Sequence, residues 1–295
     1  MANLRDIRDR INSVKNTQQI TKAMKMVAAA RLRKAQDRIM ATRPYAFKLK
    51  DIIARLIRNS DATLPLLQER KEVNRVLFVV IGSDRGLCGG FNNNLFRVVE
   101  HRIQEEFGDH LKNKTLDLIT VGAKAKKYFE HRKYNIVEDH SGFFDDLQFN
   151  KTAELMSNVV KQYENGDYDA VWLCFNEFKS VISQNRVVDQ VLPVKEQFET
   201  PAEEEEPAEI DYIYEPEPYQ ILEELVPRYL NVHLWRAMLE SFGSEQGARM
   251  AAMDNATENA KDILSDLNLK YNQARQAAIT TELSEIVSGA DALEE

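Results

Sequence analysis

The chain has few of the residues that break helices, and they are absent from both of its ends. Only 11 of its 295 residues are glycine and 8 are proline. No glycine precedes Gly82, Pro44 is the only proline before Pro65, and no proline follows Pro227. Glycine and proline are the least favourable residues in a helix interior. The two ends are therefore predicted to form helices far longer than the usual length of about 12 residues.

Cysteine is scarce as well, and its two copies, Cys88 and Cys174, form no CxxC pair. This argues against a structural zinc site or a framework of disulfides and favours a reducing compartment. The five histidines have no HExxH or other metal-ligand spacing, so neither a metal site nor a cofactor is predicted. We interpret both cysteines as small buried hydrophobic residues.

Long apolar runs are also missing. The longest run of aliphatic and aromatic residues is Val76 to Ile81, well short of the roughly 20 residues that a membrane-spanning helix needs. The first residues, MANLRDIRDR, contain no apolar signal-peptide core. We therefore expect neither a secretory signal nor a transmembrane segment.

Charge is distributed unevenly along the chain, although the formal net charge is only −8. Residues 1–60 hold 15 Lys and Arg against 4 Asp and Glu, a net charge of +11, so the other 235 residues carry −19. Such a basic end is attracted to acidic surfaces. The segment 196–224 contains twelve acidic residues, four prolines and no basic residue. Its first part, 196–219, is predicted to be a solvated linker.

Apolar residues at heptad-like spacing indicate coiled-coil helices over 1–60 and 220–290, which we expect to pair with each other. Pro44 is predicted to kink or interrupt the first helix. Gly243 and Gly247 lie within the second helix, where they can permit close approach of a neighbouring helix. The N-terminal seam begins as Leu4, Ile7, Ile11 and Val14 and then shifts in register, first to Ile20, Met24 and Val27 and next to Leu32, Ala35 and Ile39. The C-terminal seam is predicted to be Leu264, Leu267, Tyr271, Ala274 and Ala278, continued in a shifted register by Ile279, Leu283 and Ile286.

Residues 70–195 change to an alternation of strands and helices. Apolar runs at 75–81, 116–121 and 170–175 are typical of strands buried on both faces, and 187–194 is expected to add an edge strand. Segments with helical spacing, 91–107, 123–132 and 152–163, separate the first three runs. The alternation predicts a Rossmann-like α/β block with a mostly parallel sheet. The expected fold class is this block plus a long antiparallel α-helical coiled coil formed by the N- and C-terminal helices.

The segment Gly82 to Asn92, GSDRGLCGGFN, follows a predicted strand and precedes a helix, which is where a phosphate-binding turn would lie. It contains neither GxxxxGK[ST] nor GxGxxG, and Arg85 is its only cation. We interpret it as a structural or partner-contact turn. Since GxSxG and any clear grouping of Ser, His and Asp are also missing, no catalytic residue is predicted.

Two alternatives stay open from the residues alone. The basic first helix is compatible with a coiled-coil protein that binds nucleic acid, although its basic and apolar positions are mixed, unlike those of bZIP helices. Steeply salt-dependent DNA binding would favour that interpretation. The other alternative is an enzyme that uses the α/β block, which would require turnover by residues 70–195 alone.

Five motifs, in order along nearly the whole chain, resemble the γ-subunit family of F-type ATP synthases. Residues 13–36, SVKNTQQITKAMKMVAAARLRKAQ, are similar to the N-terminal helix of that family. Residues 275–290, RQAAITTELSEIVSGA, are similar to its C-terminal helix. The shorter matches are SDRGLCGGFN at 83–92, YIYEP at 212–216 and RMAAMDNAT at 249–257.

This resemblance implies a central rotor shaft whose terminal helices turn inside the α3β3 ring. Such a shaft couples proton flow through the c-ring to ATP synthesis or hydrolysis without being catalytic itself. The implied partners are the α, β and ε subunits and the c-ring, with no nucleic acid. The implied location is the cytoplasmic face of a bacterial inner membrane, as a peripheral part of the complex. Plant-type relatives carry a regulatory cysteine pair in an inserted segment, and this chain has none, so thiol control of rotation is not expected.

The resemblance also implies partner-binding residues. Those facing a β subunit from the first helix would be Lys22, Met24, Lys25 and Met26. Those bonded to the β loop that grips the rotor would be Arg275, Gln276, Thr280 and Glu282. Those near the c-ring and the ε subunit would be Tyr212, Tyr214 and Glu215.

Overall fold

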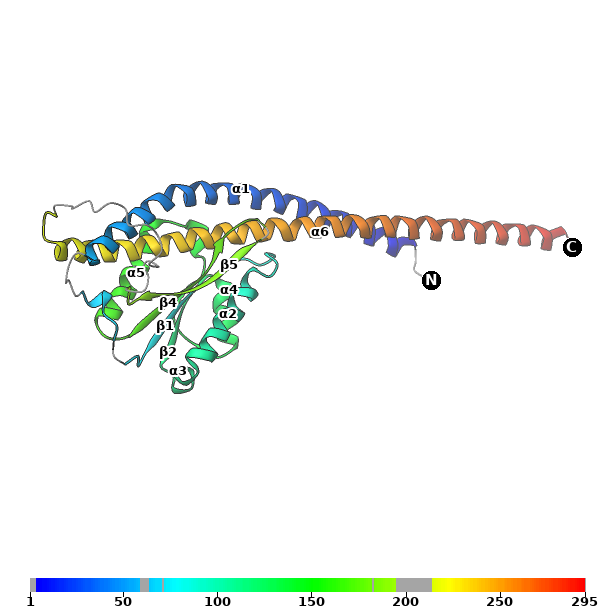
Figure 1. Ribbon diagram of the computed structural model, residues 1–295. Coiled ribbons are helices and arrows are strands. Elements are labelled where there is room, and N and C mark those ends of the chain that lie inside the picture. The colour runs from blue at the N-terminus through cyan, green and yellow to red at the C-terminus, as the bar shows by residue number, and fades with distance from the viewer. Residues whose placement is uncertain (1–3, 59–63, 71, 182, 195–213, 295) are drawn as a thin grey trace. The chain divides into compact units, whose positions relative to one another are not determined.

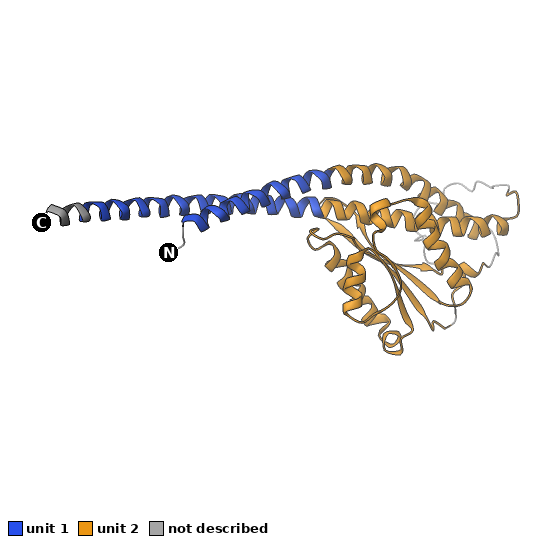
Figure 2. Cartoon of the chain, turned by 180° about the vertical axis from the view of Figure 1, so that it is seen from behind, with its two compact units in different colours: residues 1–29, 249–295 blue, residues 30–248 orange. Residues whose placement is uncertain are grey.

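The computed structural model describes residues 4–58, 64–70, 72–181, 183–194 and 214–294. The chain divides into two compact units: unit 1 combines residues 1–29 with 249–295, and unit 2 comprises residues 30–248 (Figure 2). Two long helices, α1 (Leu4–Arg58) and α6 (Pro218–Glu294), contribute to both units (Figure 1). The prediction of two very long terminal helices is confirmed.

Helix α1 continues through Pro44, so the predicted interruption there is wrong. Proline removes one N–H and thereby frees the carbonyl one turn earlier, at Met40. Pro44 is exposed and the Met40 side chain is 70% exposed. Because this side of the helix faces water, solvent can satisfy the freed carbonyl and the helix persists.

Unit 2 contains a five-stranded sheet in the order β3-β2-β1-β4-β5, the arrangement of doubly wound α/β folds (Figure 1). Strand β1 pairs in parallel with β2 and β4, β2 pairs in parallel with β3, and β5 is antiparallel to β4. The predicted mostly parallel sheet and its edge strand are confirmed. The bounds are β1 Val76–Ile81, β2 Leu116–Val121, β3 Asn135–His140, β4 Ala170–Phe178 and β5 Gln184–Leu192.

Among the residues described in unit 2 there are four shorter helices, and side chains alternate between two cores on the two faces of the sheet. Val76, Phe78 and Val80 belong to the core that also contains α2 and α4 residues. Leu77 and Val79 belong to the other core, which contains residues of α5 and of the two long helices. The bounds are α2 Phe91–Glu106, α3 Gly108–Asn113, α4 Ala123–His131 and α5 Phe149–Glu164, with 3-10 turns at Pro65–Leu67 and Phe143–Asp146.

The long helices are therefore part of the α/β block as well as of the coiled coil. The segment 30–58 of α1 supplies Leu49 and Ile53 to the second core, and the segment 218–248 of α6 supplies Leu222 and Leu230. All four are at most 5% exposed. One face of the sheet is thus covered partly by residues that lie outside the predicted block of 70–195.

Two glycines of α6 make close packing possible in unit 2. A Cβ added at Gly243 would lie 3.2 Å from Cδ1 of Ile39 on α1. A Cβ added at Gly247 would lie 3.4 Å from the carbonyl oxygen of Val181, in the connection between β4 and β5. The close approach of a neighbouring helix is confirmed at Gly243, while Gly247 packs against the β4–β5 connection.

Candidate partner-binding surfaces

In unit 1 the N-terminal part of α1 and the C-terminal part of α6 pair in antiparallel orientation (Figure 2). Two contacts define this pairing. The hydroxyl oxygens of Thr21 and Thr257 are 2.8 Å apart, and the Lys25 ammonium forms an ion pair with Asp254. The lower-numbered residue of α1 faces the higher-numbered residue of α6, as antiparallel helices require.

The α1 seam keeps one heptad register throughout unit 1, so the predicted register shift is wrong. Polar Gln18, Thr21 and Lys25 occupy seam positions, whereas Ile20 and Val27 are 60% and 54% exposed. The buried and half-buried positions at heptad spacing are Leu4, Ile7, Ile11, Val14, Gln18, Thr21, Lys25 and Ala28. Their counterparts on α6 are Met253, Thr257, Ala260, Leu264, Leu267, Tyr271 and Ala274.

The four residues predicted to face a β subunit do not share one environment. Lys22 is exposed and Met26 is 61% exposed, so both are accessible to a partner. Met24 is half-buried beside the seam, whereas Lys25 is half-buried at a seam position and its charge is directed to Asp254. Together with Ile20 and Val27, Met26 gives this stretch of α1 an exposed apolar surface.

Beyond Ala274 the α6 helix is exposed on all sides, from Arg275 to Ser288. The predicted continuation of the seam to Ala278, and in a shifted register through Ile279, Leu283 and Ile286, is therefore wrong. Four large apolar side chains are exposed there, Ile279 at 50%, Leu283 at 57%, Ile286 at 63% and Val287 at 57%. This much exposed apolar surface on one helix indicates a binding surface.

The predicted grip residues lie on the same face of α6 as these apolar side chains. At about 100° per residue, all eight positions fall within an arc of about 160°. Arg275 and Glu282 lie at one border of the arc, while Gln276 and Thr280 lie towards the other. The Thr280 hydroxyl donates to the Gln276 carbonyl at 3.0 Å, so its oxygen can still accept a bond from a partner. The opposite face carries small or polar residues, namely Ala277, Ala278, Thr281, Ser284, Glu285 and Ser288.

The predicted residues near a c-ring lie just before the start of α6, in unit 2. Tyr214 is half-buried and packs against the second core, and Glu215 is exposed. Tyr212 lies outside the described residues.

The glycine-rich loop between β1 and α2 is held by its own polar groups. One carboxylate oxygen of Asp84 accepts bonds from the N–H groups of Ala123 at 3.0 Å and Gly142 at 2.6 Å, and the other accepts from Phe144 at 3.1 Å. Ala123 is the first residue of α4, so the Asp84 carboxylate occupies the end of that helix where a phosphate could bind. These contacts support the interpretation of a structural turn. Leu87, in the same loop, is 64% exposed with a φ of 61°, so an apolar side chain projects from a backbone conformation that is unusual for leucine.

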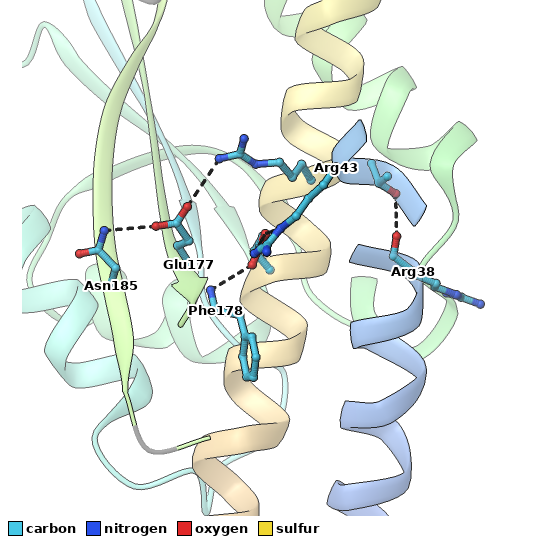
Figure 3. A network of polar contacts seen from close by, with 8 residues as sticks. Arg38, Arg43, Glu177, Phe178 and Asn185 are labelled. Atoms are coloured by element: carbon cyan, nitrogen blue, oxygen red, sulfur yellow. Dashed lines mark hydrogen bonds and ion pairs between the residues drawn. The ribbon is translucent and has the colours of Figure 1, made fainter. Parts of the chain in front are cut away.

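The buried carboxylate of Glu240 forms hydrogen bonds that connect the two long helices with the sheet in unit 2, as part of the polar network drawn in Figure 3. Glu240 of α6 is 1% exposed and accepts bonds from Arg43 of α1 and from the backbone N–H of Phe178 on β4. The neighbouring Glu177 accepts a bond from Asn185 of β5 at 3.3 Å and lies 3.7 Å from Arg236 of α6. Adjacent residues of β4 are thus both attached to α6.

Within the described ranges, no group of His, Cys, Asp and Glu side chains is placed to hold a metal ion. The helices described there include none with the length and apolar character needed to cross a membrane.

Comparison with known proteins agrees with the sequence motifs. Residues 3–293 match the family described as ATP synthase. The chain is 49% identical to the ATP synthase gamma chain of Chlorobaculum parvum, with all of both chains covered. It is 48% identical to that of Salinibacter ruber, covering all of this chain and 99% of the relative.

Two solved structures share the fold. A cryo-EM structure of the central stalk and c-ring of the Tetrahymena thermophila mitochondrial ATP synthase contains a chain with 25% identity and a TM-score of 0.58, covering 80% of this chain and 99% of that one. A cryo-EM structure of OSCP, F1 and the c-ring of the Euglena gracilis mitochondrial ATP synthase contains another at 21% identity and a TM-score of 0.67. The second match covers 98% of this chain and 94% of that one.

Proposed function

The chain belongs to the family of ATP synthase gamma chains, and we propose that it is the rotating central shaft of an F-type ATP synthase. A gamma chain is a stalk subunit, and catalysis takes place in other subunits of the complex. The proposal rests on the exposed face of α6 over residues 275–288, where apolar side chains are bordered by polar ones. A helix with such a face requires a partner surface, and here that surface is the inside of an α3β3 ring.

The shaft acts by differential contact, without chemistry of its own. Each orientation of an asymmetric shaft presents a different surface to each of three equivalent catalytic sites. Contacts that differ between sites favour different conformations in them, so rotation changes their nucleotide affinities in turn. In unit 1 the asymmetry comes from the two helices, which pair as far as Ala274 and leave α6 unpaired beyond it.

The proposed contacts with β subunits are of two kinds: charged and apolar contacts made by α1, and a hydrogen-bonded grip on α6. Exposed Lys22 attracts an acidic β surface, while Met24 and Met26 offer apolar contact, and Lys25 contributes only where it leaves Asp254. On α6, the apolar residues turn against an apolar sleeve. Polar side chains at the two borders of this face form hydrogen bonds with a loop of a β subunit. They are Arg275 and Glu282 at one border and Gln276 and Thr280 at the other.

The c-ring and the ε subunit contact this chain near residues 212–215. Exposed Glu215 is available there, whereas Tyr214 is partly covered by the core of unit 2. The complex lies at the cytoplasmic face of the inner membrane, where this chain is a peripheral subunit.

The test is purification of the complex from host membranes that express variants of this chain. Wild-type chain is expected to purify with α, β, ε and c subunits. Arg275→Ala with Gln276→Ala is expected to reduce ATP-driven proton pumping several-fold, because two bonding groups of the grip are lost. Thr281→Ala with Ser284→Ala changes the opposite face of the same helix turns and is the matched control, expected to leave pumping unchanged.

The outcomes separate the parts of the proposal. Normal recovery with unchanged pumping in the Arg275 and Gln276 variant would keep the shaft and reject these residues as the grip. A chain that purifies without ATPase subunits and binds DNA with steep salt dependence would replace the shaft by the nucleic-acid alternative.

A further inference from the structure

The paired helices of unit 1 contain a group of polar contacts next to the apolar layers of their seam. Thr21 is 8% exposed, and its hydroxyl oxygen lies 2.8 Å from that of Thr257. Each hydroxyl also lies near a carbonyl of its own helix, Gln18 at 3.0 Å and Met253 at 2.7 Å, so one hydroxyl donates across the pair while the other donates within its helix. One turn further along, Lys25 pairs with Asp254.

These contacts define the register of the whole pair. In antiparallel helices the numbers of facing residues have a nearly constant sum: 21 + 257 gives 278, and the adjoining ion pair, 25 + 254, gives 279. The first sum sets apolar residues opposite each other in four further layers, and all eight of these residues are buried or half-buried. The layers are Leu4 with Ala274, Ile7 with Tyr271, Ile11 with Leu267, and Val14 with Leu264.

The apolar layers alone do not select this register. A slip of one heptad moves the helices by about 10 Å and again brings seam positions face to face. Val14 would then face Tyr271, and Ile11 would face Ala274. Apolar contact is non-directional, so much of it would survive the slip.

The polar contacts do not tolerate the same slip. Thr21 would face Leu264 and lose the Thr257 hydroxyl, and Lys25 would exchange Asp254 for Lys261, a charge of its own sign. A slip of one heptad in the other direction would place Thr21 opposite Met250. A polar group that loses its partner in a seam is destabilising, and so are two like charges in contact.

We propose that the Thr21–Thr257 and Lys25–Asp254 layers are a register lock for the paired helices. The lock determines where α1 stops along α6 and hence how much of α6 stays unpaired. After a one-heptad slip Leu4 would lie opposite Thr281, so α1 would run alongside the residues Arg275 to Thr281. The lock therefore keeps this stretch of α6 free of α1. Its importance for the grip rests on the proposed function, whereas the lock itself does not.

The register can be measured in the full-length chain without any ATPase subunit. Spin labels at Asn12→Cys and Asp266→Cys, two exposed positions whose numbers also add to 278, report the distance between the helices by electron paramagnetic resonance. The unlocked variant is Thr21→Val, Thr257→Val and Lys25→Ala. The matched control is Thr17→Val with Thr281→Val, since these hydroxyls donate only to their own helix, each at 3.0 Å. Chains that carry only one of the two added cysteines are the background control, because any distance that they give comes from labelling of Cys88 or Cys174.

Wild type and control are expected to give a single distance distribution. The unlocked variant is expected to give a second population at a longer distance, because a slip of one heptad moves the two facing labels about 10 Å apart along the helix axis. Its melting temperature is expected to be no lower than that of wild type. A single unchanged distribution in the unlocked variant would overturn the lock. Loss of folding in that variant would also overturn it, because the layers would then supply stability instead of register. If the proposed function proved wrong, the distance distribution and the melting temperature would still test the lock.

Discussion

Arg43 of α1 donates two hydrogen bonds to one carboxylate oxygen of Glu240 on α6, from Nε at 3.2 Å and from Nη2 at 2.9 Å. The other oxygen accepts a bond from the backbone N–H of Phe178 at 3.1 Å. Since Glu240 is 1% exposed, its charge depends on these donors instead of on water. One carboxylate therefore joins α1, α6 and β4.

Removing the cation should be destabilising for this reason. Arg43→Met leaves a buried carboxylate with fewer donors, and we expect unfolding to become easier by about 2–4 kcal/mol. Chemical denaturation of the purified chain measures this. Arg38→Met, about one turn earlier on the exposed side of α1, is the control and should change stability by less than about 0.5 kcal/mol. Equal effects of the two substitutions would contradict the role of Glu240.

The Asp84 carboxylate supports the glycine-rich loop in a comparable way. Asp84→Ala leaves the N–H groups of Ala123, Gly142 and Phe144 without this acceptor, and we expect a loss of about 2–3 kcal/mol. Asp145→Ala is the control, because its ion pair with Arg85 joins side chains that are 67% and 69% exposed. Such surface pairs contribute at most about 1 kcal/mol. Thermal unfolding of both variants measures this difference. A larger loss of stability in Asp145→Ala than in Asp84→Ala would refute the assignment.

His233 makes the stability of unit 2 dependent on pH. Burial, assisted by the cationic Arg236 and Lys50, lowers the pKa of His233 from 6.5 to about 3. Below pH 6.5 the unfolded chain therefore binds a proton at His233, whereas the folded chain does not. The stabilising contribution is complete above pH 6.5 and falls as the pH falls towards 3. Between pH 7 and pH 5 this group should remove about 2 kcal/mol.

Urea unfolding at the two pH values tests the histidine. His233→Leu should lose less stability than wild type on going from pH 7 to pH 5, by about 2 kcal/mol. His131→Leu removes an exposed histidine and should behave as wild type does. An identical pH dependence in the His233 and His131 variants would show that other groups titrate.

The parts of the fold that could be predicted from sequence are those in which burial alone explains the choice of each residue. Val76 to Ile81 is uniformly apolar, and its strand is buried on both faces. Strand β3, NIVEDH, was missed because it is an edge strand whose residues are only exposed or half-buried, so polar residues replace a continuous apolar run.

The seam of unit 1 was only half predictable for a related reason. Periodicity assumes that apolar residues face inward, yet Thr21 is buried while Ile20 is 60% exposed. Thr21 is satisfied by Thr257, which lies 236 residues away in the chain, and no local pattern contains that contact. Ile20 stays exposed in unit 1, and we predict that its partner is another subunit of the proposed complex. The predicted partner-binding residues rest on the family resemblance, because no local sequence pattern distinguishes them from other exposed residues.

The extent of the α/β block leads to a last prediction. The sequence indicates a block of residues 70–195, but the sheet face that contains Leu77 and Val79 shares its core with residues of α1 and α6. Ile53 and Leu222, both 0% exposed, would be absent from a 70–195 fragment. Each fully buried aliphatic side chain contributes about 1.5–3 kcal/mol, and a whole domain is stable by only about 5–15 kcal/mol.

We therefore expect fragment 70–195 to lack a cooperative unfolding transition and to bind the hydrophobic dye ANS, which reports exposed apolar surface. Fragment 30–248, which retains both helix segments, should unfold cooperatively and bind little dye. Calorimetry and dye fluorescence on the two fragments make the comparison. A sharp transition in fragment 70–195 would mean that the sheet and its short helices form an independent domain onto which the long helices merely pack. A broad transition there, with a sharp one in 30–248, would mean that the helices and the sheet fold as one unit.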